Sequence, residues 1–483
     1  MNTANYLSWR RIYIAIVLSL TTVLFLPLRN NYFFADDFYN LIVAAETTSI
    51  SDFFRPNFQH FGLLLRLYYF VMYHSFGLNY STYFYFMLSI YLLNLLLSYY
   101  LLCQVFDSPL PLLMLPLYAW NPLFVEIVNW QCQIAQLLCL IFILLTLISL
   151  TIYAKSNFTQ ARWLALSISS SILSISAFTV GALIPLIVGL YYYMVLKKKI
   201  TMNFKPDVKV LAGFFCIAIV YLVFALRRHH GIPMNLSSAV PMLIKYVTGS
   251  IFYVLIPSFA GYGPVKKEAA LPLAIYACSC LAMVGVLMVV LRKELRWKLL
   301  LFALFYTVSI YILQGIARLH IYGYAITYWL RYNTFQIIAG CIALGELLRA
   351  ISSRCKAKGV GWRVTALIAF QIFFLCGSSE YIGRENVRLQ QTFHYGKIKS
   401  YITHIKVSYE SLKDRLMDNR VIFLDRKGIV PTWIMDHDLS PLNRQIHFLR
   451  IILPKDKGIK GARKKTDVPL YVIDESGFFK RVS

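Results

Sequence analysis

The chain has 483 residues, of which 58% are hydrophobic and 14% are charged, and its mean hydropathy is +0.60. Soluble globular proteins carry roughly 25% charged residues, so the composition excludes an ordinary soluble domain. The formal net charge of +26 suits contact with anionic lipid headgroups. No basic module with a recognisable nucleic-acid motif accompanies that charge, so we expect no nucleic-acid partner. The composition predicts an all-α polytopic membrane protein.

A helix needs about 20 apolar residues to cross a bilayer. The first candidate span follows Arg10 and Arg11, and no small-x-small cleavage site comes after it, which predicts a retained span and a cytoplasmic N-terminus. Basic clusters in the later loops then fall on one side of the membrane, which supports about eleven transmembrane helices. The predicted spans are 12–28, 81–104, 109–125, 131–154, 162–178, 180–196, 208–226, 271–291, 298–316, 331–349 and 362–379.

Two further apolar segments do not enter this count. Residues 60–76 contain Arg66 and His74, and residues 237–259 are interrupted by two prolines. Counting 237–259 as a span would move the basic cluster at 292–298 to the wrong side. We therefore predict that both segments are amphipathic or re-entrant helices at the external surface. The alternative is that one of them is a full span, which gives twelve.

The last part of the chain is more polar. Residues 397–418 have the pattern of an amphipathic helix, and RVIFLD (420–425) and PLYVID (469–474) resemble short buried strands. The sequence therefore predicts a transmembrane catalytic domain over 1–380 and a small C-terminal extracytoplasmic α/β domain over 381–483. The basic stretch KDKGIKGARKK (455–465) is interpreted as a solvated loop, with a lipid-phosphate contact as the alternative.

The nine cysteines do not indicate a metal site or a disulfide framework. All but Cys355 lie in or beside apolar segments, and the tail after residue 380 has none. Cys278 and Cys280 form a C-x-C without a second pair nearby, whereas a structural zinc site needs four ligands. We interpret the cysteines as small apolar fillers.

The acidic stretch FFADDFYN (33–40) stands at the external end of the first span. A carboxylate near the interface costs less than one at the bilayer centre, so this place is tolerable. Asp37 could cap a helix that begins at Phe38, because Asp is a favoured N-cap residue. This structural explanation gives Asp36 no role. A functional role for the pair is the alternative explanation.

Other polar residues are predicted on the same external side. Each of them alone is explained as an interface anchor or a snorkelling side chain. Together they place carboxylates and fixed cations on one face, which suits an anionic substrate whose reaction needs a base and a stabilised leaving group. The candidates are Asp36 and Asp37 as catalytic residues and Arg55, Glu126, His320 (in the predicted loop RLHIYGYAITYW), Arg331 and Tyr332 as substrate-binding residues.

The order of these motifs resembles the GT-C superfamily of polytopic membrane glycosyltransferases, in particular the protein O-mannosyltransferase and lipid A aminoarabinose transferase types. The resemblance runs through ADDF, FRP, FGLNYSTYFYF, the P-x-x-x-E-x-x-x-W of NPLFVEIVNW, and YWLRYN, over most of the first 350 residues. The motifs are short. Relatives often carry a Lys-Glu pair before the sixth span, where this chain reads SAFTVGALIP (176–185).

The resemblance implies an enzyme that takes a sugar from a polyprenyl-phosphate donor. An acid of the first external loop, here Asp36 with Asp37 beside it, would deprotonate an acceptor hydroxyl that attacks the anomeric carbon with inversion. Arg55, Arg331 or His320 would stabilise the departing phosphate, and Glu126 would position the acceptor or a divalent metal, whose use is left open. The expected acceptor is a glycan, a lipid or a protein. The enzyme itself is expected to contact membrane lipids. The expected location is a bacterial inner membrane with a periplasmic active site, or alternatively the endoplasmic reticulum membrane.

Three other functions are weighed against this one. A transporter or flippase of lipid-linked sugar would carry charges deep in its spans and internal repeats, which the sequence does not show. A polysaccharide polymerase or ligase would be expected to use a large late loop rather than acids in the first. A non-catalytic membrane subunit would tolerate loss of charge at Asp36 and Arg331.

Overall fold

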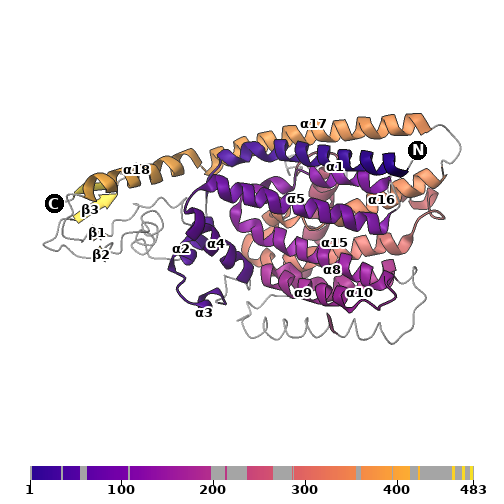
Figure 1. Ribbon diagram of the computed structural model, residues 1–483, viewed down its shortest axis with the longest axis horizontal. Coiled ribbons are helices and arrows are strands. Elements are labelled where there is room, and N and C mark those ends of the chain that lie inside the picture. Colours follow the sequence, from indigo (N-terminus) through magenta and orange to yellow (C-terminus); the bar gives the residue numbers. More distant parts are fainter. Residues whose placement is uncertain are drawn as a thin grey trace.

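The computed structural model describes residues 3–33, 36–54, 62–106, 109–196, 213–214, 236–264, 285–286, 288–354, 360–393, 395–413, 422–424, 460–462, 470–473 and 479–481. Most of this part is helical. Long helices lie side by side in a bundle, and one end of the bundle carries a group of shorter helices (Figure 1).

Six helical segments of the described chain are long and apolar enough to cross a membrane, as expected for an integral membrane protein. Five of them coincide with predicted spans. They are α1 (Thr3–Phe25) with η1 (Leu26–Asn30), α5 (Tyr80–Val105), η2 (Gln131–Gln133) with α8 (Ile134–Lys155), η3 (Thr179–Leu183) with α10 (Ile184–Tyr191) and η4 (Tyr192–Leu196), and α15 (Trp297–Tyr322).

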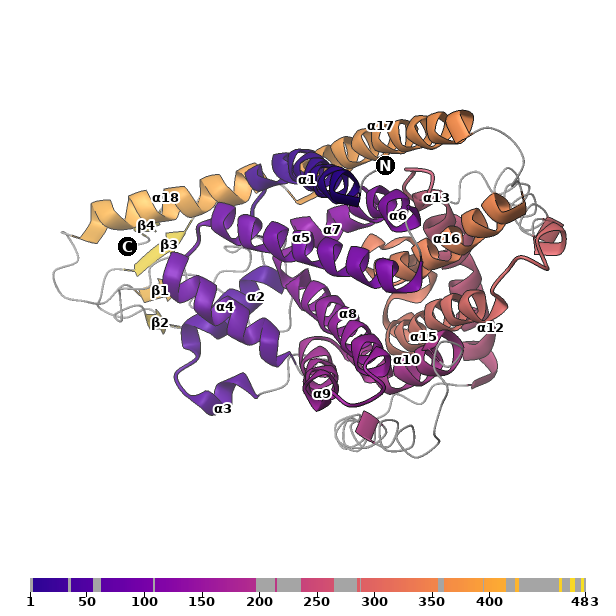
Figure 2. The same cartoon turned by 45° about the vertical axis from the view of Figure 1, so that its right-hand side comes forward.

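The sixth segment favours the alternative for residues 237–259, that they form a span. Here α12 (Leu236–Ser250) continues through a π-helical turn, η6 (Ile251–Leu255), into α13 (Ile256–Ser258), and Val240–Ser258 is apolar enough to span. It packs along α15 in the bundle (Figure 2). The proline of α13 stands in its first turn, where a missing N–H costs little. Its length and composition favour the alternative, that this segment is a full span, and the surface-helix prediction is left to experiment.

The other segment, 60–76, is too short to be a span. Its described part forms α4 (Leu63–Phe76), whose 14 residues are too few to cross a bilayer, and its place at the external surface stays a prediction. It packs against α2 (Asp36–Glu46) and α3 (Ile50–Phe53) at one end of the bundle (Figure 1).

The remaining predicted spans differ from the structure in their bounds or are interrupted. Residues 109–125 break into α6 (Leu110–Ala119) and α7 (Phe124–Asn129), and 162–178 become α9 (Ala161–Ala177). Residues 331–349 do not begin a helix at 331, because η8 (Gly323–Tyr328) and η9 (Leu330–Tyr332) precede α16 (Ile337–Arg354). The spans 208–226 and 271–291 lie outside the described residues except for a few positions.

The C-terminal part combines helix and sheet. The 34-residue helix α17 (Val360–Phe393) runs through residue 380 and is followed by α18 (Tyr395–Lys413). Four short strands form a sheet of order β2-β1-β3-β4, in which β1 is parallel to β2 and β3, and β4 is antiparallel to β3. They are β1 (Ile422–Leu424), β2 (Lys460–Ala462), β3 (Leu470–Ile473) and β4 (Phe479–Arg481), and β1 and β3 lie inside the two predicted strands. The extracytoplasmic location and the domain boundary stay predictions.

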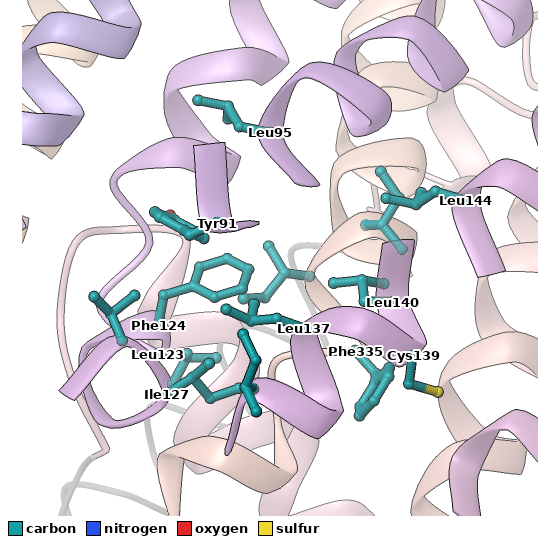
Figure 3. Packing of buried hydrophobic residues seen from close by; sticks show 14 of the residues in the cluster. Tyr91, Leu95, Leu123, Phe124, Ile127, Leu137, Cys139, Leu140, Leu144 and Phe335 are labelled. Carbon is teal, nitrogen blue, oxygen red and sulfur yellow. The ribbon is translucent and has the colours of Figure 1, made fainter. Parts of the chain in front are cut away.

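The short helix α7 is set into the core of the bundle. Phe124 and Ile127 are buried, and Figure 3 shows them beside Leu137 of α8, with Tyr91 of α5 over Phe124. The rings of Tyr91 and Phe124 lie 4.7 Å apart. This apolar face fixes α7 between α5 and α8, so the polar residues of α7 keep a defined place.

Candidate functional site

Asp37 is a buried acid whose carboxylate is held by two hydrogen bonds. Its Oδ1 accepts from the Tyr69 hydroxyl of α4 at 2.6 Å and from the backbone N–H of Cys132 at 2.9 Å. The side chain is fully buried. Burial first, and then the Asp37 carboxylate, raise the pKa of the Tyr69 phenol, so it stays protonated and donates. Asp37 therefore ties the start of α2 to α4 and to the segment before α8.

Asp36 occupies the first position of α2 and is partly exposed. The predicted helix began at Phe38 with Asp37 as its cap. The observed helix begins at Asp36, so both acids lie in its first turn, where a negative charge is favoured by the helix dipole. The capping prediction for Asp37 is thus corrected, and the two acids divide into one that is buried and anchored and one that is open to solvent.

Arg331 lies in η9, just before α16, and is enclosed by aromatic rings. Its guanidinium carbon is 4.3 Å from the ring centroid of Trp329, 4.4 Å from that of Trp130 and 5.2 Å from that of Tyr332. Only 14% of its side chain is exposed. A desolvated cation over an aromatic face gains about 2 kcal/mol. The two indoles come from segments 199 positions apart in the sequence but meet at this one cation.

Glu126 of α7 is the ionic partner of Arg331. The Nη1 of Arg331 donates to Oε1 of Glu126, and the backbone N–H of Arg331 donates to Oε2 at 3.2 Å. Burial lowers the pKa of Arg331, but the Glu126 carboxylate more than offsets this, so the pKa is raised and the guanidinium stays charged. The ion pair therefore links the NPLFVEIVNW motif to the YWLRYN motif, as expected if both motifs belong to one site.

The acid pair and the Arg331 cluster converge on Cys132. The thiol of Cys132 lies within electrostatic reach of Asp36, Asp37 and Arg331. Cys132 follows Trp130 by two positions, so the same short segment stacks on the cation and binds the acid. Five of the seven predicted site residues, Asp36, Asp37, Glu126, Arg331 and Tyr332, are thus brought into one region.

The structure does not place the side chains of the other two predicted site residues. Arg55 lies outside the described residues. His320 is helical, because α15 extends to Tyr322, so the predicted loop RLHIYGYAITYW is wrong over its first part. The structure does not describe the side chain of His320.

Several residues of this region were not among the candidates. Tyr69 and Cys132 hold Asp37, and Trp130 and Trp329 enclose Arg331. The two tryptophans could have been predicted from the sequence, since Trp130 belongs to NPLFVEIVNW and Trp329 belongs to YWLRYN. A backbone N–H of Cys132 has no signal in the sequence, and a tyrosine in an aromatic-rich helix looks like any interfacial ring.

The described part of the chain contains no group of three or more His, Cys, Asp or Glu side chains arranged to hold a metal ion. Glu126, the acid considered for this role, directs both of its oxygens to Arg331.

The comparisons with known proteins add one structural neighbour. No protein-family model matches the chain, and no curated protein matches it. Among solved structures, the chain is similar to the crystal structure of ArnT from Cupriavidus metallidurans bound to undecaprenyl phosphate. The sequence identity is 13%, the TM-score is 0.45, and the match covers 95% of this chain and 86% of that chain.

Proposed function

We propose that the protein is an integral membrane glycosyltransferase that moves a sugar from a polyprenyl-phosphate donor to an acceptor hydroxyl. The observation that carries the proposal is the division of the acid pair. Asp37 is buried and held by Tyr69 and Cys132, while its neighbour Asp36 is partly exposed in the same helical turn. A general base must be held firmly and must also reach its substrate, and the pair meets both needs.

In the proposed reaction, Asp36 takes the proton of the acceptor hydroxyl. The oxygen attacks the anomeric carbon as the bond from that carbon to the phosphate oxygen breaks, and the phosphate leaves with the bonding electrons. One displacement of this kind inverts the anomeric configuration. Asp37 keeps α2 in place, and its fixed charge is accepted because two donors bind it.

Arg331 is proposed to stabilise the departing phosphate. A guanidinium has five N–H donors, and it matches a phosphate better than an ammonium does. Enclosure by Trp130 and Trp329 removes much of its freedom before substrate binds, which is the condition for effective electrostatic stabilisation. We propose this cation rather than a divalent metal as the counter-charge, because both oxygens of Glu126 face Arg331.

The proposal places the site at the external end of the first span, in a bacterial inner membrane with a periplasmic face or in the endoplasmic reticulum. The charged residues of the proposed site lie in α2, α7 and η9 rather than in the middle of the six candidate spans. This favours catalysis at the membrane surface over the transport alternative, which needs charges along a path through the bilayer.

The test uses the purified full-length protein in liposomes, with a polyprenyl-phosphate sugar that is radiolabelled in the sugar. Lipid, glycan and protein fractions serve as acceptors. We expect label in an acceptor, with the inverted anomeric configuration by NMR, and no faster movement of the donor between leaflets than in liposomes without protein. Movement of the donor without transfer would overturn the proposal in favour of a flippase.

A further inference from the structure

Three buried asparagines, with the exposed Gln390 beside them, join three segments that are far apart in the sequence. Nδ2 of Asn31 donates to the side-chain oxygens of Asn129 and Asn386, the latter at 2.9 Å, and Nε2 of Gln390 donates to Oδ1 of Asn31 at 2.9 Å. The three asparagines are each at most 9% exposed. They come from the segment after η1, from α7 and from α17.

Asn129 is the centre of this set. Besides binding Asn31, its Nδ2 donates to the hydroxyl of Tyr395 in α18 at 2.8 Å. Its backbone oxygen accepts the hydroxyl of Tyr80, the first residue of α5, also at 2.8 Å. One residue of α7 is therefore bonded to α5, to α18 and to the segment that leads into α2.

The place of Asn129 relates it to both halves of the proposed site. It stands three positions after Glu126, which binds Arg331, and three positions before Cys132, whose N–H binds Asp37. The chain from Asn31 leads directly to Asp36. The acid helix is thus anchored on the 126–132 segment at two points, once before the acids through Asn31 and once at Asp37.

The charges of the site also reach the C-terminal helix. The Tyr395 hydroxyl lies within electrostatic reach of Asp37 and Glu126, and burial raises the pKa of this phenol. It therefore stays neutral at physiological pH and keeps its hydrogen bond with Asn129. Buried polar networks whose members are bonded to one another fix a single arrangement, which apolar packing does less strictly.

We propose that Asn129 is a positioning residue for the transfer reaction, which sets Asp36 relative to Arg331 and makes the junction of α17 and α18 part of the active site. This inference rests on the proposed function. A misplacement of about 1 Å between reacting groups costs about 100-fold in rate, so loss of such an anchor should appear in turnover more than in donor binding.

The first arm of the test compares Asn129→Leu with Asn94→Leu in the full-length protein. Asn94 is a matched control, since it is also fully buried and its amide donates to the backbone oxygens of Ile90 and Leu137 within the bundle. We expect N129L to lower kcat by about 10- to 100-fold with the donor KM changed less than about threefold. The control should lose thermal stability while kcat stays within about twofold. Equal losses of kcat in the two variants, or no loss in N129L, would overturn the proposal.

The second arm needs no activity. Tyr395→Phe removes one hydroxyl and keeps the ring, so it should fold, and Tyr91→Phe is its control because the Tyr91 hydroxyl binds only the backbone oxygen of Ala119 among the contacts described. We measure hydrogen exchange in the peptide that covers 36–46. Faster exchange there in Y395F and N129L, but not in Y91F, supports the coupling even if the wild type shows no sugar transfer. Unchanged exchange in both variants would overturn it.

Discussion

Two adjacent aspartates serve different purposes in this molecule. Asp37 has no exposed surface and accepts hydrogen bonds from Tyr69 and Cys132, whereas Asp36 is partly exposed one position earlier. The sequence indicates that this pair is unusual for its place. It cannot indicate which acid is anchored, because one of the two donors is a backbone group 95 positions away.

The division predicts opposite effects on stability. Asp37→Asn leaves two buried donors with a weaker, neutral acceptor and buries a new NH₂ group, so we expect a loss of about 1–3 kcal/mol in the free energy of unfolding. Asp36 is partly exposed, so solvent can replace much of what its carboxylate contacts, and we expect Asp36→Asn to cost clearly less than Asp37→Asn. Thermal unfolding in detergent measures both. Equal destabilisation would contradict the assignment of Asp37 as the anchor.

We predict that sugar transfer needs the guanidinium group of Arg331, and not only a positive charge at this position. Lysine at this position keeps the charge but cannot stack between Trp130 and Trp329 or present a planar set of donors. We expect Arg331→Lys to lower kcat/KM by about 10- to 100-fold.

The matched control for this change is Arg354→Lys, at a half-exposed arginine whose pair with Glu294 is 3.9 Å long. Such pairs contribute little, so its kcat/KM should stay within about twofold. Wild-type kcat/KM in R331K would show that Arg331 does not act on the departing phosphate.

At the scale of elements, the long apolar runs were predictable and the interrupted ones were not. Five spans follow from length and hydropathy, and the prolines in two of them, Pro27 of η1 and Pro185 of α10, stand in the first turn of a helix. The segment of α12, η6 and α13 is not predicted as a span, because it contains two prolines and because a span here moves the basic cluster at 292–298 to the other side. Pro257 follows a π-helical turn and stands at the start of α13, whereas Pro241 lies inside α12, and α12 packs against α15.

If the segment of α12, η6 and α13 is a span, its two ends must lie on opposite sides of the membrane. Val240 and Tyr262 are both well exposed, so cysteines placed there in a cysteine-free background should be reactive. If Val240–Ser258 crosses the membrane, a maleimide that cannot permeate should label one of them from outside and the other only after the vesicles are opened. Labelling of both from the same side would restore the surface-helix interpretation.

At the scale of the whole molecule, the structure joins segments that a linear reading separates. The motifs around Asp36, Glu126 and Arg331 could be predicted to share a face, since topology places the loops between spans. The contribution of Asn386 and Tyr395 could not, because the tail was read as a separate domain after residue 380. The helix α17 runs through that position, Asn386 of α17 bonds to Asn31, and Tyr395 of α18 bonds to Asn129.

The most direct test of the account is transfer by Asp36→Asn, assayed with labelled polyprenyl-phosphate sugar at saturating donor. The account predicts a fall of at least about 100-fold in transfer, with donor binding retained, because the base is lost while the anchors at Asp37 and Asn129 remain. Glu380→Gln is the matched control, since this acid is exposed and pairs only with Arg384 of its own helix among the described contacts. Transfer at the wild-type rate by D36N would contradict the central claim.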